Sequence, residues 1–348
     1  MPERPVTPAE VVAFQAAACE SAGSHLYRRI LDGVLADLEA GGVCHRLLAH
    51  RDDDPFGSAL ALRFLGAVHR LVLDGGAPEL AALYPSTGGD PDAGDVVDTF
   101  LRTVEANEDA VDRGTSQGVQ TNEVGRSAAL VGGYAVVLRE TGLPLRILEV
   151  GSSAGLNLRF DRFAYDTGAG VVGDPNSPVR FAGVWEGTPP PLPATFEVAE
   201  RRGCDRNPLD ATTDDGRLRL LSYVWPDQPD RIARLEAAIA VARQVPVELE
   251  QADAVAWLQH HLGRPRPGVA TVVVHSIVIQ YLPPDRRRQL RATIEDAGAG
   301  ATADAPLAWL RMEPAGELAD VRLTTWPGGD ERLLGTSGYH GAPVCWAG

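Results

Sequence analysis

The stretch RILEVGSSAGLNL, residues 146–158, decides the fold of the second part of the chain. A run of apolar residues ends in an acid, and a glycine-containing turn leads directly into another apolar segment. This order is typical of the strand, loop and helix that hold a nucleotide in α/β proteins. The spacing of the glycines indicates which nucleotide such a loop fits.

Two common nucleotide loops are excluded. A dinucleotide loop needs G-x-G-x-x-G, whereas Ser153 stands at the second glycine position after Gly151. A P-loop needs a lysine, and all 32 basic residues of this chain are arginines. The lack of lysine also excludes Schiff-base and pyridoxal phosphate chemistry. The spacing that fits is E-x-G-x-x-x-G, formed by Glu149, Gly151 and Gly155.

This spacing resembles motif I of the class I S-adenosylmethionine (SAM)-dependent methyltransferases, which reads roughly D/E-x-G-x-G-x-G. In that motif small residues let the backbone approach the methionine part of the cofactor, and the acid accepts hydrogen bonds from its ammonium group. A strand–glycine–helix joint without a ligand is the alternative interpretation. The resemblance implies that the following residues bind SAM: Glu149, Gly151, Ser152, Ser153, Gly155 and Asn157.

A second segment, RRGCDRNP (201–208), supplies Asp205. It resembles the acid after the second methyltransferase strand, which chelates the ribose hydroxyls. Asp205 follows Glu149 by 56 residues (205 − 149), farther than the ~20 of a compact βαβ unit, so we expect the proline-rich residues 163–195 to be an insertion that is looped out. The alternative is a turn acid before Asn207-Pro208.

Two further segments follow in the order of the methyltransferase motifs. In VPVELEQADAVAWL (245–258), Asp253 and Ala254 resemble the positions that contact the adenine, although Asp253 is also a natural helix cap. TVVVHSIVIQYLPP (271–284) resembles the fourth strand, and ligands bind beyond the carboxyl ends of such strands. We therefore expect Ser276 to contact the cofactor and His275 or Tyr281 to serve as general base, with a structural histidine as the alternative.

The segment QTNEVGRSAAL (120–130) is expected to begin the long helix that precedes the glycine-loop strand. In class I methyltransferases this helix often passes near the methionine carboxylate. The resemblance therefore implies cofactor contacts for Asn122, Glu123 and Arg126, with Arg126 paired to that carboxylate. A polar helix cap with a solvated arginine is the alternative. Tyr339-His340-Gly341 either reach the substrate side or close the sheet.

Periodicity predicts two domains. Residues 1–118 read as an all-α domain that begins with the capping box Thr7-Pro8-Ala9-Glu10, and EDAVDRGTSQGVQ (108–120) reads as a hinge. Residues 119–348 alternate strand-like and helix-like runs, which predicts a Rossmann-like, mostly parallel sheet covered on both faces. VRLTTW–PGGD–ERLLGTS (321–337) predicts an antiparallel hairpin that closes the sheet.

Several longer strings together resemble the bacterial DUF2332 family, whose members have a methyltransferase-like core. They are HRLVLDGGAPELAALYPSTGG (69–89), QTNEVGRSAAL (120–130), LEVGSSAGLNLRFDRFAYD (148–166), RRGCDRNPLD (201–210), VVHSIVIQYLP (273–283) and YHGAPVCW (339–346). The resemblance spans nearly the whole chain. It implies the class I methyltransferase-like fold and leaves the reaction open.

Composition limits the partners. The net charge of −15 argues against broad nucleic-acid or anionic-membrane surfaces. The four cysteines form no C-x-x-C pair, and no residue pattern predicts a metal site. MPERPVTPAEVVAF (1–14) does not resemble a signal peptide, and no run of ~20 apolar residues occurs, so we expect a soluble, cytoplasmic protein.

The leading hypothesis is a SAM-dependent methyltransferase acting on a small molecule, with the helical domain and the insertion forming the lid and acceptor pocket. A SAM-consuming lyase or cyclase that uses the same pocket is one alternative. A non-catalytic binding or regulatory protein is the other, and Ser153 and the long insertion keep it open. The sequence predicts neither the acceptor, the pathway nor the oligomeric state.

Overall fold

The computed structural model describes residues 6–49, 51 and 57–348, and the chain folds into two compact units. The first unit comprises the residues up to Thr121 together with Thr213–Ala233. The second comprises Asn122–Thr212 and Arg234–Gly348. The return of Thr213–Ala233 to the first unit was no part of the sequence prediction. Residues 1–5, at the start of the stretch considered for a signal peptide, lie outside the described residues.

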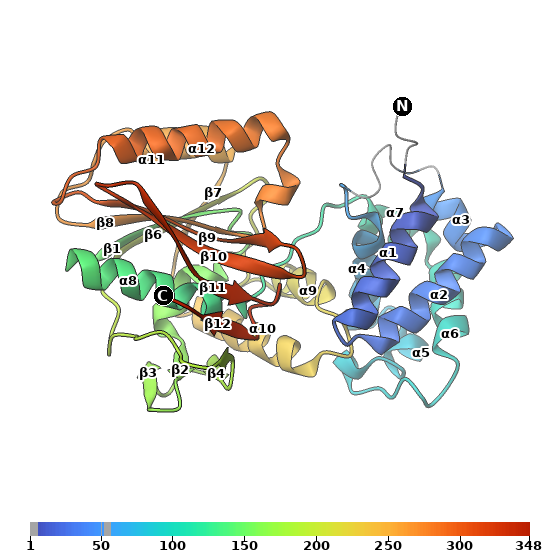
Figure 1. The fold of residues 1–348 in the computed structure, drawn as a ribbon. Coiled ribbons are helices and arrows are strands. Elements are labelled where there is room, and N and C mark those ends of the chain that lie inside the picture. Colours follow the sequence, from blue (N-terminus) through green and yellow to red (C-terminus); the bar gives the residue numbers. More distant parts are fainter. Residues whose placement is uncertain (1–5, 50, 52–56) are drawn as a thin grey trace. The chain divides into compact units, whose positions relative to one another are not determined.

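The described residues of the first unit form helices (Figure 1). The helices are α1 (Pro8–Ser21), α2 (His25–Ala40), α3 (Val43–Leu48), α4 (Leu60–Leu73), α5 (Pro78–Ala81), η1 (Pro85–Thr87), α6 (Val96–Ala106), α7 (Glu108–Thr115) and α9 (Asp214–Ser222). The capping box at Thr7 and Glu10 is present as predicted. The predicted hinge is wrong at 108–115, because these residues form α7 and bury Val111 and Thr115 against the other helices.

A buried histidine ties the returning segment to the rest of the first unit. On α4, His69 Nδ1 donates to the backbone carbonyl of Ser222 at 3.2 Å, and Nε2 accepts from Ser86 Oγ at 2.9 Å. Complete burial lowers the pKa of His69 to about 4. The neutral ring therefore links α4 to α9 and η1.

The second unit is built on a nine-stranded, mostly parallel sheet in the order β5-β12-β11-β10-β9-β8-β1-β6-β7. Its strands are β1 (Leu145–Val150), β5 (Trp185–Glu186), β6 (Val198–Asp205), β7 (Glu248–Gln251), β8 (Ala270–Ser276), β9 (Leu307–Ala315), β10 (Leu318–Trp326), β11 (Asp330–Ser337) and β12 (Val344–Trp346). Strands β7, β6, β1, β8 and β9 are parallel to one another. The predicted hairpin of β10 and β11 is confirmed as antiparallel.

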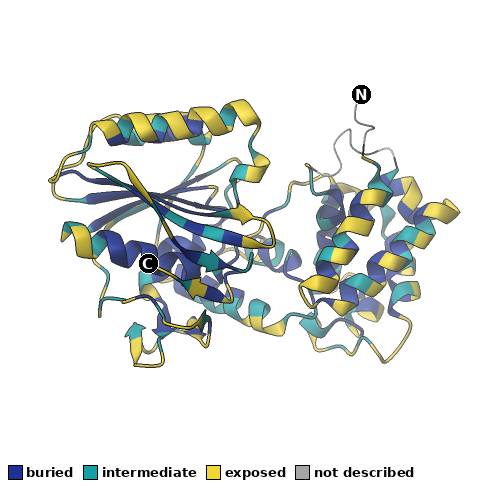
Figure 2. Cartoon of the chain, in the orientation of Figure 1, coloured by how far each residue is buried: buried dark blue, intermediate teal, exposed yellow. Residues whose placement is uncertain are grey.

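Helices cover both faces of this sheet, as the alternation of strands and helices predicted. Helix α8 (Arg126–Thr141) lies on one face, and α11 (Ala254–Leu262) and α12 (Pro284–Ala299) lie on the other (Figure 1). The central strands are almost wholly buried, whereas α12 exposes its outer side (Figure 2). Helix α10 (Pro229–Ala242) carries the chain from the first unit into the second.

The expected insertion is mostly a small sheet of its own. Strands β2 (Ala164–Asp166), β3 (Val171–Gly173) and β4 (Arg180–Ala182) pair in the order β3-β2-β4. Phe163, Tyr165 and Phe181 are buried there, with the rings of Tyr165 and Phe181 stacked at 5.3 Å. The insertion is not wholly looped out, because β5 pairs with β12 at one edge of the main sheet.

Two elements beside the glycine loop differ from the sequence prediction. Helix α8 begins at Arg126 and not at 120–123, which precede it as a non-helical segment. The segment after the loop is the 3₁₀ element η2 (Leu156–Arg162), in which Arg159 departs from helical geometry. Among the described residues, no helix is both long and apolar enough to cross a membrane.

Candidate functional site

The glycine loop begins where β1 ends and turns through three left-handed residues. The φ angles are 69° at Gly151, 51° at Ser153 and 64° at Gly155. A Cβ on Gly151 would lie 2.5 Å from Val278 Cγ2, so this position is closed to any larger side chain. Ser153 adopts a left-handed backbone conformation that glycine adopts more readily. This explains why the methyltransferase motif usually has a glycine at this position.

The crowding at Gly155 can be separated from its backbone conformation. Gly155 and Gly142 share a φ of 64°, but a Cβ on Gly155 would lie 2.8 Å from Leu249 Cδ2, whereas one on Gly142 would meet nothing within 4 Å. We expect Gly142→Ala to lower the free energy of unfolding by ~1 kcal/mol. Gly155→Ala should cost about 1 kcal/mol more, because the Leu249 side chain or the loop must also move. Urea unfolding of the two variants measures the difference, and equal losses would contradict the steric account.

The segment before α8 holds the loop from one side. Asn122 Oδ1 accepts a hydrogen bond from the backbone amide of Leu156 at 2.9 Å. The buried Asn157 donates through Nδ2 to the backbone carbonyl of Glu123 at 3.2 Å and accepts from Ser127 Oγ at 2.7 Å. Asn122, Glu123 and Asn157 therefore lie together at the loop, and their side-chain and backbone groups fix its path.

Asp205 holds the loop from the other side, at the carboxyl end of β6. Its Oδ2 accepts from the backbone amide of Ser153 at 2.9 Å, and its Oδ1 accepts from the amide of Asn207 at 2.9 Å. Ser152 Oγ donates to the backbone carbonyl of Cys204 at 3.3 Å on the same strand. The carboxylate of Asp205 thus serves as the turn acid that the sequence offered as an alternative, and it also holds the glycine loop.

Glu149 is the unusual group of the site. Only 4% of it is exposed, and its Oε2 has no hydrogen-bond partner among the described residues. Burial raises the pKa of Glu149 to about 8, against the opposing effects of Arg159 and Arg126 and with a contribution from Asp205. A buried carboxyl with an unused oxygen is costly unless something partners it, so this position favours a bound cationic or hydrogen-donating group.

Arg126 joins the start of α8 to two later segments of the second unit. Its Nε donates to the backbone carbonyl of Tyr339 and its Nη1 to that of Ser276, both at 3.1 Å. The contact is close, because a Cβ on Gly341 would lie 2.1 Å from the backbone of Gly125. The loop that carries Tyr339-His340-Gly341 therefore packs on the start of α8, beside the end of β8.

His275 points to the opposite face of the sheet from Glu149, where it is completely buried. Its Nδ1 lies 2.6 Å from Glu313 Oε1, and its Nε2 accepts the indole N–H of Trp309 at 2.9 Å. Because the indole can only donate, Nε2 carries no proton and Nδ1 donates to Glu313. Both ring nitrogens are thus bonded within the protein, which favours the structural alternative over the predicted general base.

The remaining predicted residues lie near the carboxyl edge of the sheet. Asp253 caps α11 by accepting from the backbone amides of Val255 and Ala256, both at 3.1 Å, and it pairs with Arg286. Ala254 is the first residue of α11. Tyr281, in η3 (Ile279–Tyr281) just after β8, is 55% exposed.

Sequence reasoning missed two charged residues. Arg159 is buried in η2, where Nε donates to the carbonyl of Val245 at 2.7 Å and Nη1 to that of Gly155 at 2.8 Å; burial lowers its pKa to about 10. Glu313 binds His275 and the backbone amides of Val278 and Ile279. The sequence signal for each was a charged residue in or next to an apolar run: Arg159 in LNLRF (156–160) and Glu313 in LAWLRME (307–313).

Other chemical features of the described residues are plain. All four cysteines are free, with Cys19, Cys44 and Cys204 buried and Cys345 exposed. No group of three or more His, Cys, Asp or Glu side chains within the described part of the chain is arranged to hold a metal ion.

Comparison with known proteins gives one result. A family model described as "Uncharacterized protein conserved in bacteria (DUF2332)" matches residues 9–346, so the chain belongs to the DUF2332 family. No curated protein and no solved structure matches the chain.

Proposed function

We propose that this protein is a SAM-binding enzyme, and in the simplest case a cytoplasmic methyltransferase with a small-molecule acceptor. The observation that carries the proposal is the buried carboxyl of Glu149, whose Oε2 lacks a partner, beneath a left-handed loop at the carboxyl end of β1. The strand order β7-β6-β1-β8-β9 supports it. From β1 the chain adds β6 and β7 on one side and then β8 and β9 on the other, and ligands of open α/β sheets bind at the point between β1 and β8 where the direction changes.

The residues present fit the chemical groups of SAM. Glu149 offers a carboxyl oxygen for an ammonium group, and Asp205, which accepts from the backbone amides of Ser153 and Asn207, places a carboxylate at the loop as the acceptor for ribose hydroxyls. Arg126 brings a positive charge to the end of β8 for a carboxylate. The residue set therefore matches the three polar parts of the cofactor.

SAM supplies a methyl carbon made electrophilic by the adjacent sulfonium. The contribution of the chain is positioning, with the ammonium bound by Glu149 and the ribose by Asp205. The binding of an ammonium ion favours the ionised form of Glu149 and releases its proton. Where the acceptor is a hydroxyl or an amine, we assign the general base to the exposed phenol of Tyr281 rather than to the enclosed His275.

Thermal-shift titration with SAM, S-adenosylhomocysteine and NAD tests the proposal. We expect the first two to raise the melting temperature in a saturable way and NAD to have no effect. Asp205→Ala should weaken SAM binding at least ~10-fold, which corresponds to about 1.4 kcal/mol. Asp174→Ala is the matched control, because Asp174 accepts from the backbone amide of Asn176 in the same kind of turn, within the insertion.

No stabilisation by SAM or its product at about 1 mM would count against any SAM enzyme. Equal losses from Asp205→Ala and Asp174→Ala would mean that only turn stability had changed. The reaction class follows from the products of SAM turnover: S-adenosylhomocysteine indicates methyl transfer, and methylthioadenosine indicates a lyase or cyclase. Binding without turnover would indicate a regulatory protein.

A further inference from the structure

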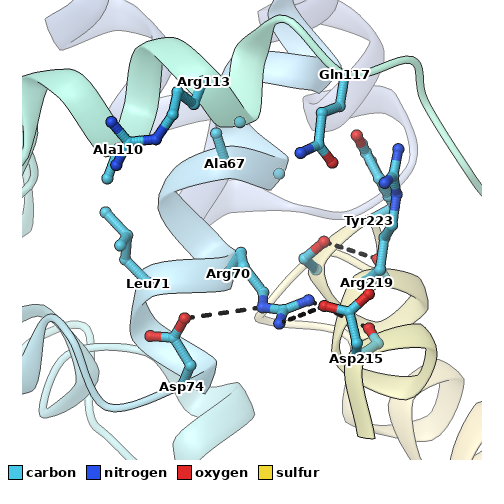
Figure 3. A pocket seen from close by; sticks show the side chains of 13 residues that line it. Ala67, Arg70, Leu71, Asp74, Ala110, Arg113, Gln117, Asp215, Arg219 and Tyr223 are labelled. Atoms are coloured by element: carbon cyan, nitrogen blue, oxygen red, sulfur yellow. Dashed lines mark hydrogen bonds and ion pairs between the residues drawn. The ribbon is translucent and has the colours of Figure 1, made fainter. Parts of the chain in front are cut away.

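The first unit contains a cavity of about 340 Å³ whose lining residues come from α4, α7 and α9 and from the residues that follow each of these helices (Figure 3). Every lining residue belongs to the first unit, so the cavity is complete without the second. Its volume lies within the range of small-molecule sites, roughly 300–1,000 Å³.

Three arginines line this cavity, and they differ in their partners. Arg70 is neutralised, with its Nη2 2.9 Å from Asp215 Oδ1 and its Nε 3.7 Å from Asp74 Oδ2. Neither Arg113 nor Arg219 pairs with a carboxylate among the described residues. Within the described part of the chain, Arg219 donates only through Nη2, to the backbone carbonyl of Gly118 at 3.3 Å. Two positive charges at the cavity thus lack an acid, in a chain whose net charge is −15.

Two donors at the cavity also lack acceptors. The Nε atoms of Arg70 and Arg219 are buried and have no hydrogen-bond partner among the described residues; that of Arg70 still lies 3.7 Å from Asp74 Oδ2, whereas that of Arg219 faces no carboxylate there. A buried guanidinium N–H without an acceptor carries a desolvation cost of about 1–3 kcal/mol, which a bound acceptor removes. Guanidinium groups bind carboxylate and phosphate oxygens through two parallel hydrogen bonds, so the missing acceptor is best supplied by an oxyanion.

The rest of the lining suits an organic molecule rather than a bare ion. Ala67, Leu71 and Ala110 provide an apolar wall, and Tyr223 adds an aromatic ring. Figure 3 shows the amide of Gln117 reaching into the cavity from the end of α7, between Arg113 and Arg219. The lining therefore combines unpaired cations, an amide and apolar surface in one small space.

We propose that this cavity binds a small organic anion, which Arg113 and Arg219 recognise through a carboxylate or phosphate group. The lining carries three arginines and two aspartates, so a monoanion makes the occupied site neutral (3 − 2 − 1 = 0). The site is separate from the glycine loop of the second unit and holds whether or not that loop binds SAM.

The test titrates the full-length protein with three probes: benzoate, inorganic phosphate and benzamide, the neutral isostere of benzoate. We expect saturable thermal stabilisation by benzoate, by phosphate or by both, and none by benzamide. Whichever anion binds identifies the group that the cavity recognises. Arg219→Gln should weaken binding at least ~10-fold in calorimetry. Arg113→Gln should weaken it less, about 2–5-fold, because Arg113 is exposed.

Two further variants separate binding from folding. Arg139→Gln removes an exposed arginine on α8, outside the cavity, and should leave anion binding unchanged. Ala110→Phe fills the cavity from a half-buried position of α7 without removing a charge, and it should abolish binding while the melting temperature of the free protein stays within a few degrees. The proposal is overturned by no saturable effect of either anion at about 10 mM. Equal stabilisation by benzamide, or an equal loss in Arg139→Gln and Arg219→Gln, also overturns it.

Discussion

Glu149→Gln will make the protein more stable at alkaline pH, by on the order of 3–5 kcal/mol at pH 9. The pKa of Glu149 is raised to about 8 in the folded state by burial and is near 4.3 in the unfolded chain. The folded state therefore holds a proton that the unfolded state has lost. The stabilising contribution of this proton is fully present below about pH 4.3 and is lost as the pH rises through about 8. Glutamine has the same shape and no charge, so its variant avoids this loss.

Denaturant unfolding of both proteins at pH 5 and pH 9 measures the effect. The two curves should nearly coincide at pH 5 and separate at pH 9. Glu140→Gln is the control, because Glu140 pairs with Arg332 and its pKa is lowered, so this change should bring no gain at alkaline pH. Equal stability of wild type and Glu149→Gln at pH 9 would show that the carboxyl of Glu149 is hydrated or paired.

His275→Ala will lower the free energy of unfolding by about 2–4 kcal/mol. The substitution opens a cavity beneath α12 and leaves the indole N–H of Trp309 buried without an acceptor. It also removes the donor that faces Glu313 Oε1. Because Glu313 accepts from the backbone amides of Val278 and Ile279, the loss should loosen the segment after β8 as well.

A double-mutant cycle separates this structural role from catalysis. His275→Ala and Glu313→Gln should be non-additive in urea unfolding, because the two residues act on one hydrogen-bonded chain. If instead His275→Ala unfolds like the wild type and loses only SAM turnover, the ring is the general base that the sequence first suggested.

The layout of the second unit could largely be predicted, because apolar strands and amphipathic helices alternate along the chain. The run Ala270–His275 and the helix after Pro284 lie where periodicity placed them. Periodicity fails where tertiary contacts decide the structure. Glu108–Thr115 is polar enough to resemble a hinge, yet Val111 and Thr115 bury one side of it as a helix. The return of Thr213–Ala233 depends on contacts such as that of His69 with Ser222, which no local pattern encodes.

The candidate site could be predicted where the residue types of a short motif determine the backbone conformation or the position of a side chain at a strand end. Gly151 and Gly155 reveal a left-handed turn, and Asp205 follows a strand end that parallel pairing brings beside the loop. The face of the sheet to which a side chain points was harder to predict. His275 stands at a strand end, as a catalytic residue would, but it points away from the loop because alternate residues of β8 face opposite sides. Arg159 and Glu313 were missed because their roles depend on distant backbone groups.

The central claim is that SAM binds at Glu149, and the proton balance of binding tests it most directly. Calorimetric titration with SAM at pH 7, in two buffers of different ionisation enthalpy, measures the protons released. With a pKa of about 8, Glu149 is mostly protonated before binding and ionises against the ammonium group. We therefore predict the release of between about 0.5 and 1 proton by the wild type and close to none by Glu149→Gln. Absence of binding, or binding with no proton released by the wild type, would contradict the account.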